Sequence, residues 1–535
     1  MDNILSRSIA ITFSLLVALY VIFFKVYDER DPRYVSPNER PRFFLAHALA
    51  ERCSVEVTPE VRRFGWSVDM AQRGDRYYSD KPIFQSLLAA PVVAVYRTVT
   101  GNAIREANAL WLIKATTLVP FAILLFWIFY GAVFSFSRSI PFALCSAWAL
   151  FAGTPVSTYF TVFFSHSVSA TLLFAFFLLI RRIITEPEQR LLLGGGLIAG
   201  VLFLTEYQTA VPLGILSLYL FIMLPERRRF LFFIAGTLPL ALIFITYNMA
   251  AFETPITFGV VHEGHEDFRA MHERGLFGIG IPNGWVLLDL LFSLKMGIFT
   301  LSPFLFFSTA GIYRRWQENR SETVTLLAII TTYFLMVSSL ANPHGGWAFG
   351  ARYLVPVVPF LALFAAYGMY ALFEKSDLWR GIAATLSIVS CFIFTAANGM
   401  RPLIEEIFRN PLANYYLMAI REQYFIFASI ISPFGMSPAQ SFAIFFVFFT
   451  SVSLWSVSFV APGRRIAGTA IAAAVATVII TSMLFPHYGK QDERKFFYWM
   501  MTQDRMGASA AMKEQVFDNN FSRTAEILRS VRHEK

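Results

Sequence analysis

Three carboxylates stand within four residues directly after an apolar run that carries no charge. The run covers residues 8–24, and the carboxylates are Asp28, Glu29 and Asp31. A carboxylate beside low-dielectric lipid can have its pKa raised, which suits a general base that takes up a proton near neutral pH. A charged stop after a membrane helix has the same appearance. We therefore take Asp28 as a candidate catalytic base with Glu29 beside it, and keep the structural interpretation open.

A second polar stretch, residues 74–82, reads GDRYYSDKP and places Lys81 close to Tyr78. Basic residues at a membrane surface meet lipid phosphates, and tyrosines there are anchors by default. Lys81 is therefore a candidate phosphate-binding residue, and Tyr78 is a candidate neighbour of the substrate. The alternative is an interfacial anchor, which the same residue types also fit.

A third stretch, residues 342–356, reads NPHGGWAFGARYLVP. It predicts a tight turn that presents Arg352 at the start of a helix, with Trp347 and Tyr353 nearby. An arginine together with the free backbone N–H groups of a helix N-terminus holds a phosphate well. The alternative is a glycine-rich turn with an interfacial anchor, and the sequence favours neither of the two.

Two further polar residues lie next to apolar segments. Glu206 stands between two short apolar segments, and His166 opens another one. An ionisable residue within apolar segments is a functional-site hypothesis by default, so both are candidate substrate-binding residues. The stretch 262–275 contains three histidines and several carboxylates, but its spacing matches no metal signature, and a solvated loop is the better interpretation.

These residues belong to a chain that is built for a membrane. Of its 535 residues, 56% are hydrophobic and 15% are charged, with a mean hydropathy of +0.54. This composition predicts an all-α polytopic membrane protein. The net charge of +9 does not indicate nucleic acid, because the lysines and arginines are scattered as short clusters between apolar runs.

Hydropathy predicts about thirteen transmembrane helices, each needing about 20 apolar residues. They lie near residues 8–25, 109–133, 140–158, 165–181, 191–206, 208–224, 230–250, 286–312, 323–341, 353–373, 381–398, 441–461 and 466–485. The run 82–96 is shorter and contains two prolines, so we expect it to be interfacial or re-entrant.

The basic clusters predict the orientation. When 82–96 is not counted as a crossing, the short basic clusters fall on one side, which places the N-terminus in the cytoplasm and the C-terminus outside. The long polar loops then share the outer face: 26–106, 251–285, 342–352, 399–440 and the tail from 486. Within the first of these loops, Phe44, Leu45, Ala48 and Leu49 share one helical face, which predicts a helix lying on the membrane surface. Any chemistry is expected at the outer leaflet.

Nucleotide-binding motifs are absent from the sequence. It contains no Walker loop and no GxGxxG stretch after a strand, so a cytoplasmic nucleotide or nucleotide sugar is not the expected co-substrate. A donor must reach the outer face in another way.

Taken in order, the acidic pair and the segments RYYSDKP, TYFTVFFSHSVSATL, EYQTAVPLG, FETPITFG and GGWAFGARYLVPVVPFLAL resemble the bacterial polyprenyl-phosphate-dependent glycosyltransferases of the GT-C superfamily, similar to glycosyltransferase family 39. The resemblance covers roughly residues 1–375. It implies a GT-C-like bundle with a long first outer loop, an acidic base and a lipid-linked sugar donor.

Carried onto this chain, the resemblance makes Asp28 the base and Glu29 its orienter or a metal ligand, with Lys81 and Arg352 handling the phosphate. The family often continues the SDKP motif with Ala-Pro-Gly or Pro-Gly, whereas this chain has residues 83–85 as Ile-Phe-Gln, which leaves the shape of the lipid groove open. The implied reaction is an inverting transfer of a sugar from a polyprenyl-phosphate donor to an acceptor hydroxyl. The acceptor is a glycan, a lipid or a protein, and membrane lipids are further partners.

Several alternatives stay open at this point. The chain could be a transporter or flippase for a lipid-linked glycan, or a ligase or polymerase that uses a lipid-linked oligosaccharide. No cofactor is required by the resemblance, although Asp28 and Glu29 could bind Mg²⁺ or Mn²⁺. We expect a catalytic module at 1–375, further transmembrane helices at 376–485 and a small helical tail at 486–535, all in a bacterial inner membrane with the site on the periplasmic side.

Overall fold

The computed structural model describes residues 2–25, 36–101, 105–275, 277–458, 460 and 490–505. Over these residues the chain is almost entirely helical, as the sequence predicts. Asp28 and Glu29 lie outside the described residues, as does the predicted span 466–485.

Within the described part of the chain, seven helical segments are long and apolar enough to cross a membrane. They confirm that the chain is a polytopic integral membrane protein. Their bounds are Glu106–Ser137 (α5, η2 and α6), His166–Thr185 (α9), Arg227–Phe252 (η4 and α12), Arg320–Ser338 (α17), Arg352–Phe373 (η7 and α18), Asp377–Met400 (α19) and Pro438–Ser458 (α21).

Four shorter apolar helices accompany these spans. They are Arg7–Ile22 within α1 (Asp2–Ile22), Ile140–Ala152 (α7), Gln189–Thr205 (α10) and Tyr207–Met223 (η3 and α11). They cover four of the predicted spans, and the helices in 8–25 and 140–158 end clearly earlier than expected, at Ile22 and Ala152. In the case of 140–158, the helix stops at Ala152, and Thr154 caps a separate short helix, α8 (Pro155–Phe160).

The prediction of a continuous span at 286–312 is wrong. The segment instead forms α14 (Gly284–Phe292), α15 (Ile298–Leu301), the 3₁₀ turn η6 (Pro303–Phe307) and α16 (Ser308–Glu318). Gly297 and Pro303 stand at the breaks, and a proline or glycine interrupts a helix even where every neighbour is apolar. Hydropathy reports how apolar a segment is, so it could not detect that this segment is divided into several short helices.

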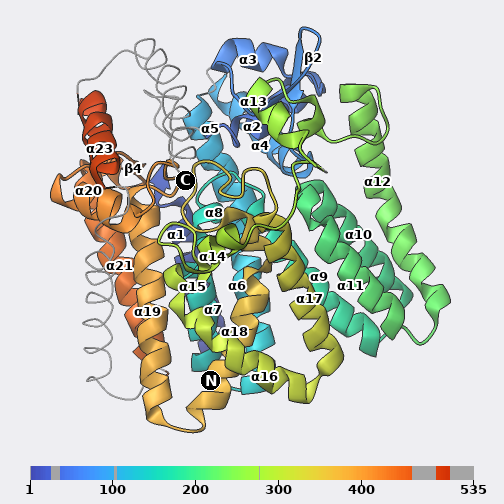
Figure 1. Cartoon of the computed structure of the whole chain (residues 1–535), viewed down its shortest axis with the longest axis vertical. Helices are drawn as coiled ribbons and strands as arrows, with labels where there is room; N and C mark the ends of the chain where they lie inside the picture. Colours follow the sequence, from blue (N-terminus) through green and yellow to red (C-terminus); the bar gives the residue numbers. More distant parts are fainter. Residues whose placement is uncertain are drawn as a thin grey trace.

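The centre of the bundle is α18, of whose most apolar window 89% is buried, whereas only 28% of the corresponding window of α12 is buried. Helices α16 and α18 approach each other very closely at Gly311, where an added Cβ would lie 1.6 Å from the carbonyl oxygen of Phe364. Helices α10, α11 and α12 form a separate lobe at the side of the bundle (Figure 1). The exposed apolar face of α12 is therefore the natural lipid-facing surface.

The polar loops gather at one end of the bundle. Figure 1 shows α2 (Arg40–Arg52), α3 (Thr58–Phe64), α4 (Phe84–Thr100) and α13 (Glu266–His272) there, while the N-terminal end of α1 lies at the opposite end. Two short antiparallel sheets lie among these loops: β1 (Phe24–Lys25) pairs with β4 (Ala428–Ser429), and β2 (Met70–Arg73) pairs with β3 (Arg76–Ser79). The C-terminal α23 (Lys490–Arg505) packs on η8 (Leu412–Tyr416), near α20 (Leu417–Arg421).

Helix α2 differs from the predicted surface helix. The helix is present, but Arg40 through Ala48 are all buried, so it does not lie on the headgroups. It packs against α4, which is one continuous helix despite Pro91 and is not among the apolar helices that fit a span. Burial of α2 on all sides brings its charged residues into the interior, where they need partners.

Candidate functional site

A chain of hydrogen bonds joins three segments that are far apart in the sequence. Arg42 of α2 donates from Nη2 to Oγ of Ser165 at 2.9 Å, and Ser165 donates to Oε2 of Glu206 at 2.5 Å. Ser165 directly precedes α9, and Glu206 lies between α10 and η3. The guanidinium of Arg42 is thereby linked to a carboxylate through one hydroxyl, although its side chain is almost completely buried.

His166 lies beside the same carboxylate. Its Nδ1 is 3.3 Å from Oε2 of Glu206, and neither ring nitrogen makes a hydrogen bond within the described part of the chain. The ring is 3% exposed and makes edge-on contacts with three aromatic rings: Tyr159, Phe164 and Tyr353. A buried imidazole with open ring nitrogens is a group that a ligand could satisfy.

Arg352 reaches this group from the beginning of η7 (Arg352–Val357). Its Nη2 donates to the hydroxyl of Tyr353 at 2.9 Å, and its guanidinium lies over the ring of Phe164. Its Nε has no hydrogen-bond partner among the described residues. The turn before it holds the guanidinium in place, because Gly345, at a φ of +66°, leaves room that an added Cβ would fill 2.3 Å from Nε.

Lys81 is held by two carboxylates. Its Nζ lies 3.0 Å from Oδ2 of Asp69 and also contacts Asp80. Burial raises the pKa of Asp80 to about 6 against the opposing charge of Lys81, whereas at Asp69 the ammonium outweighs burial and the pKa is lowered. Lys81 is therefore one member of a partly buried ion cluster with Asp69 and Asp80, and its predicted role in phosphate binding stays a prediction.

Glu263 completes this cluster. Its side chain accepts a hydrogen bond from the backbone N–H of Met70 at 3.1 Å and is 3% exposed. Burial and the neighbouring Asp80 raise the pKa of Glu263 to about 9, against the charge of Lys81. The carboxyl is consequently protonated at neutral pH, so the cluster holds fewer charges than its residue types suggest.

The arginines and the acidic cluster share one electrostatic environment. Arg42 interacts with Asp80 and Glu206 as well as with Arg352, and Arg352 interacts with Asp69. Two guanidinium groups of like charge are thus held in one buried region. The carboxylates of Glu206, Asp80 and Asp69 offset part of their mutual repulsion, and two neighbouring guanidinium groups are a suitable arrangement for binding an anion.

The structure brings four of the predicted site residues together: Arg352, Tyr353, His166 and Glu206. Two others lie elsewhere. Tyr78 of β3 is buried against Phe252 at the end of α12, and the ring of Trp347 faces Arg401. Their predicted roles in substrate binding stay predictions.

Four further residues belong to the site, and the sequence had not pointed to them: Arg42, Asp69, Asp80 and Glu263. Arg42 had been placed on the polar side of a surface helix. The adjacent Asp80 and Lys81 could have signalled an ion pair, but the contribution of Asp69 depends on the β2–β3 hairpin, which brings the residue before β2 next to the residues after β3.

The described residues contain no group of three or more His, Cys, Asp or Glu side chains that could hold a metal ion. Asp28 and Glu29, which we predicted as alternative metal ligands, are not among those residues.

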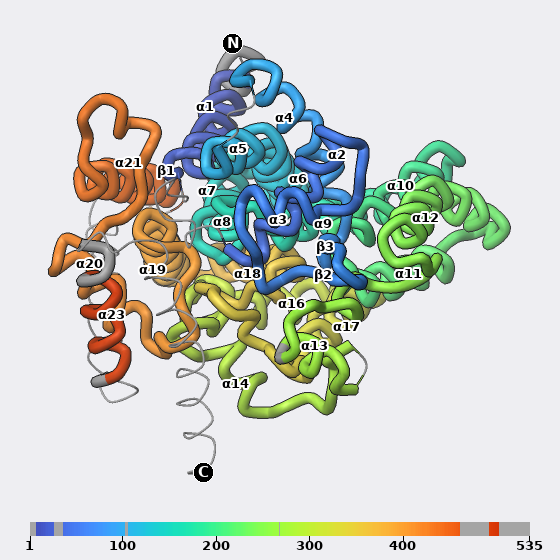
Figure 2. Tube along the Cα trace, turned by 90° about the horizontal axis from the view of Figure 1, so that it is seen from above, coloured from blue at the N-terminus to red at the C-terminus, as the bar shows by residue number. Residues whose placement is uncertain are grey.

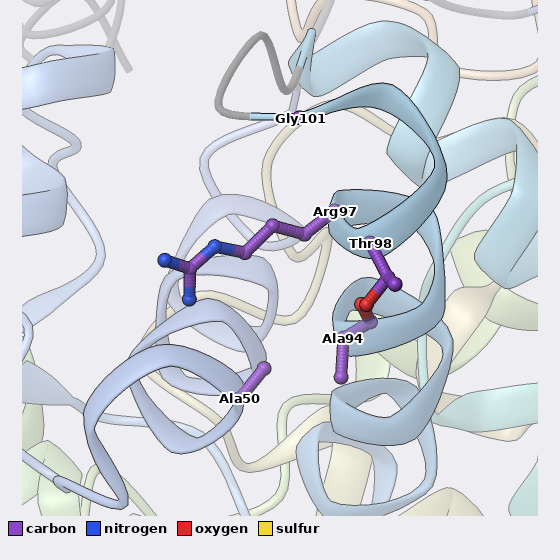
Figure 3. Close-up of a pocket in the computed structure, with 5 residues that line it drawn as sticks. All are labelled: Ala50, Ala94, Arg97, Thr98 and Gly101. Carbon is purple, nitrogen blue, oxygen red and sulfur yellow. The ribbon is translucent and has the colours of Figure 1, made fainter.

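A groove between α2 and α4 is a separate feature. It is lined by Ala50, Ala94, Arg97, Thr98 and Gly101 (Figure 3). Its one charged side chain, Arg97, is partly exposed and lies 3.5 Å from a carboxylate oxygen of Glu51. We call the region around Arg42 and Arg352 the arginine site. Among the described residues, the groove lacks the buried N–H donors without a hydrogen-bond partner that distinguish the arginine site.

Comparison with known proteins gives a limited result. No protein-family model matches the chain, and no curated protein matches it. The chain is similar to the crystal structure of ArnT from Cupriavidus metallidurans in the apo state, with 15% sequence identity and a TM-score of 0.48, over 88% of this chain and 78% of that chain. It is also similar to ArnT from Cupriavidus metallidurans bound to undecaprenyl phosphate, with 14% identity and a TM-score of 0.49, over 88% of this chain and 76% of that chain. Both TM-scores are below 0.5, so these similarities do not establish the activity of this chain.

Proposed function

We propose that this protein is a membrane glycosyltransferase that moves a sugar from a polyprenyl-phosphate donor to an acceptor hydroxyl at the outer face of the membrane. One observation carries the proposal. Two arginines, Arg42 of α2 and Arg352 at the start of η7, interact with each other, and each has a buried guanidinium Nε without a hydrogen-bond partner among the described residues. Such a pair fits a phosphate whose lipid tail stays in the bilayer.

The reaction needs a base and a stabilised leaving group. The acceptor oxygen attacks the anomeric carbon, a new C–O bond forms there, and the bond from that carbon to the phosphate oxygen breaks. The electron pair of that bond leaves with the polyprenyl phosphate, and Arg42 and Arg352 stabilise the developing charge. Removing one preorganised donor of this kind typically lowers the rate of catalysis about 10²- to 10³-fold.

The proton of the acceptor hydroxyl passes to Asp28 in this proposal, because Asp28 is the first carboxylate that follows α1 in the sequence. A positioned base typically contributes about 10²- to 10⁴-fold. Lys81, which forms ion pairs with Asp69 and Asp80, is a further candidate for contact with the phosphate in this proposal. The outer-face location and the bacterial inner membrane belong to the same proposal.

The direct test is binding of undecaprenyl phosphate to the purified protein in nanodiscs. Replacing Arg352 with Gln removes the charge and should weaken binding about 10- to 150-fold, because a hydrogen bond to a charged group contributes about 1.5–3 kcal/mol. Arg97→Gln is the matched control, since Arg97 is an arginine at the groove and outside the cluster. Equal affinity in the wild type and the Arg352 variant would refute the assignment.

Turnover is tested with a panel of polyprenyl-phosphate-linked sugars and acceptor extracts. Release of polyprenyl phosphate together with a glycosylated acceptor is the expected result. Movement of the intact lipid-linked sugar across the bilayer, without release of the phosphate, would instead identify a flippase. Asp28→Asn should abolish transfer while undecaprenyl phosphate still binds, and full activity in that variant would exclude Asp28 as the base.

A further inference from the structure

Lys114 is a fully buried lysine inside a membrane-spanning segment. Its exposed fraction is 0%, and it lies within the candidate span Glu106–Ser137. A charged side chain at such a place is costly and is usually retained for a function. The phosphate and proton chemistry proposed above makes no use of it.

The ammonium of Lys114 bridges two backbone segments. Its Nζ donates to the carbonyl oxygen of Phe24 at 2.8 Å and to that of Thr161 at 3.3 Å. Glu39, whose side chain is buried and accepts the N–H of Phe163, supplies an opposite charge in the same region. The lysine begins a π-helical turn, η2 (Lys114–Leu118), and turns of this kind are frequent at functional sites.

The first of these segments is the exit of α1. Trp111, one turn before Lys114, donates from Nε1 to the carbonyl of Ile22 at 2.9 Å, so α5 (Glu106–Ile113) and η2 together satisfy carbonyls at the end of α1. In addition, Lys25 of β1 donates from Nζ to Oδ1 of Asn108 in α5 at 3.2 Å. Figure 2 shows α1 and α5 as neighbours, and α5 also contacts β1. Strand β1 in turn pairs with β4.

The second segment leads into the arginine site. Thr161 begins the turn between α8 and α9, and this turn ends at Ser165, which accepts from Arg42. In the sequence, the acidic pair follows the end of α1, with Asp28 four positions after Phe24. Lys114 therefore connects the segment that precedes the predicted base with the segment that carries the arginine cluster.

We infer that Lys114 is a positioning residue: by holding the carbonyls of Phe24 and Thr161 together, it fixes the segment at the end of α1, which precedes the predicted base in the sequence, relative to the Arg42–Ser165–Glu206 chain. The inference rests on the proposed function and deepens it. A displacement of about 1 Å between reacting groups can cost about 10²-fold in rate. A side chain of similar length without N–H donors should therefore leave the fold and the phosphate site in place while lowering turnover.

The experiment compares Lys114→Met with Lys295→Met. Lys295 is also buried, at 6% exposed, and its Nζ also donates to a backbone carbonyl, that of Glu405, at 2.9 Å. Hydrogen–deuterium exchange in nanodiscs should increase in peptides that cover 22–25 and 161–166 for the Lys114 variant only. Unchanged exchange in those peptides would overturn the inference.

Kinetics distinguishes a positioning role from a structural one. With the donor found in the turnover screen, Lys114→Met should lower kcat per folded molecule at least 10-fold at an unchanged KM for the donor, and Lys114→Arg should restore part of the loss. Wild-type kcat in Lys114→Met would refute the role. If the wild type binds no undecaprenyl phosphate while exchange still increases in Lys114→Met, the proposed function fails and Lys114 is a structural clamp, which overturns its positioning role.

Discussion

A pair of neighbouring glycines allows the role of Arg352 to be tested without touching the arginine itself. Gly345 and Gly346 both have positive φ values, +66° and +75°, so an alanine at either position meets a similar backbone penalty of about 1–2 kcal/mol. Their surroundings differ. An added Cβ at position 345 would lie 2.3 Å from Nε of Arg352 and 2.8 Å from the ring of Tyr353, whereas at position 346 the nearest atom, from Glu406, is 3.9 Å away.

The expected result follows from this difference. Gly345→Ala must displace the guanidinium of Arg352, which is the flexible end of a side chain, so the fold should survive. If the guanidinium contributes a charge-assisted hydrogen bond of about 1.5–3 kcal/mol to a phosphate, its displacement weakens binding about 10- to 150-fold. Gly346→Ala should bind undecaprenyl phosphate as tightly as the wild type.

Both quantities can be measured on the same samples. Thermal unfolding in detergent should give similar shifts for the two variants because the backbone strain is shared, while titration with undecaprenyl phosphate in nanodiscs should separate them. Equal affinities for the two variants would show that the position of Arg352 does not control phosphate binding. A large loss of stability confined to Gly345→Ala would mean that the guanidinium cannot move aside, and the reasoning about its flexibility would be wrong.

Three further predictions concern stability. Gly311→Ala places a methyl group against a backbone carbonyl of α18 and should lower the unfolding temperature clearly, whereas Gly214→Ala, with no atom within 4 Å of the added Cβ, should not. Because burial raises the pKa of Glu263 from 4.5 to about 9, the folded state binds more protons than the unfolded state, and stability should fall as pH rises through this window. Unfolding temperatures at several pH values should show a smaller fall in Glu263→Gln, and an unchanged slope would contradict the assignment. Lys81→Met leaves two carboxylates without their cation and should cost about 3 kcal/mol in chemical unfolding, since breaking a buried ion pair typically costs 3–5 kcal/mol, while a wild-type midpoint would show that the cluster is hydrated.

Much of the fold could be predicted from hydropathy because a membrane span has a simple requirement, which is enough apolar length. The spans at 109–133, 165–181, 230–250, 323–341, 353–373, 381–398 and 441–461 are confirmed for this reason. The prediction of a span at 286–312 was wrong because glycine and proline divide this segment into short helices, although its composition is as apolar as that of a span. Helix α2 was placed on the membrane surface because its two faces differ, but the packing of α4 and the outer loops buries both faces.

The candidate site was predictable only in part. Arg352, Tyr353, His166 and Glu206 were found because polar residues on apolar ground are conspicuous in any sequence. Arg42 was missed, because an arginine in a charged loop carries no such signal.

What the sequence by itself determined is a membrane-spanning helical chain and the types of residue that could bind a phosphate. Only the tertiary structure decided which of these residues meet. Arg42 and Ser165 are 123 positions apart, and the backbone of Phe163 reaches Glu39 across 124. Helical periodicity relates residues three or four positions apart and carries no information about such pairs. Their contact depends on how the helices pack, and that packing is set by many small apolar contacts acting together.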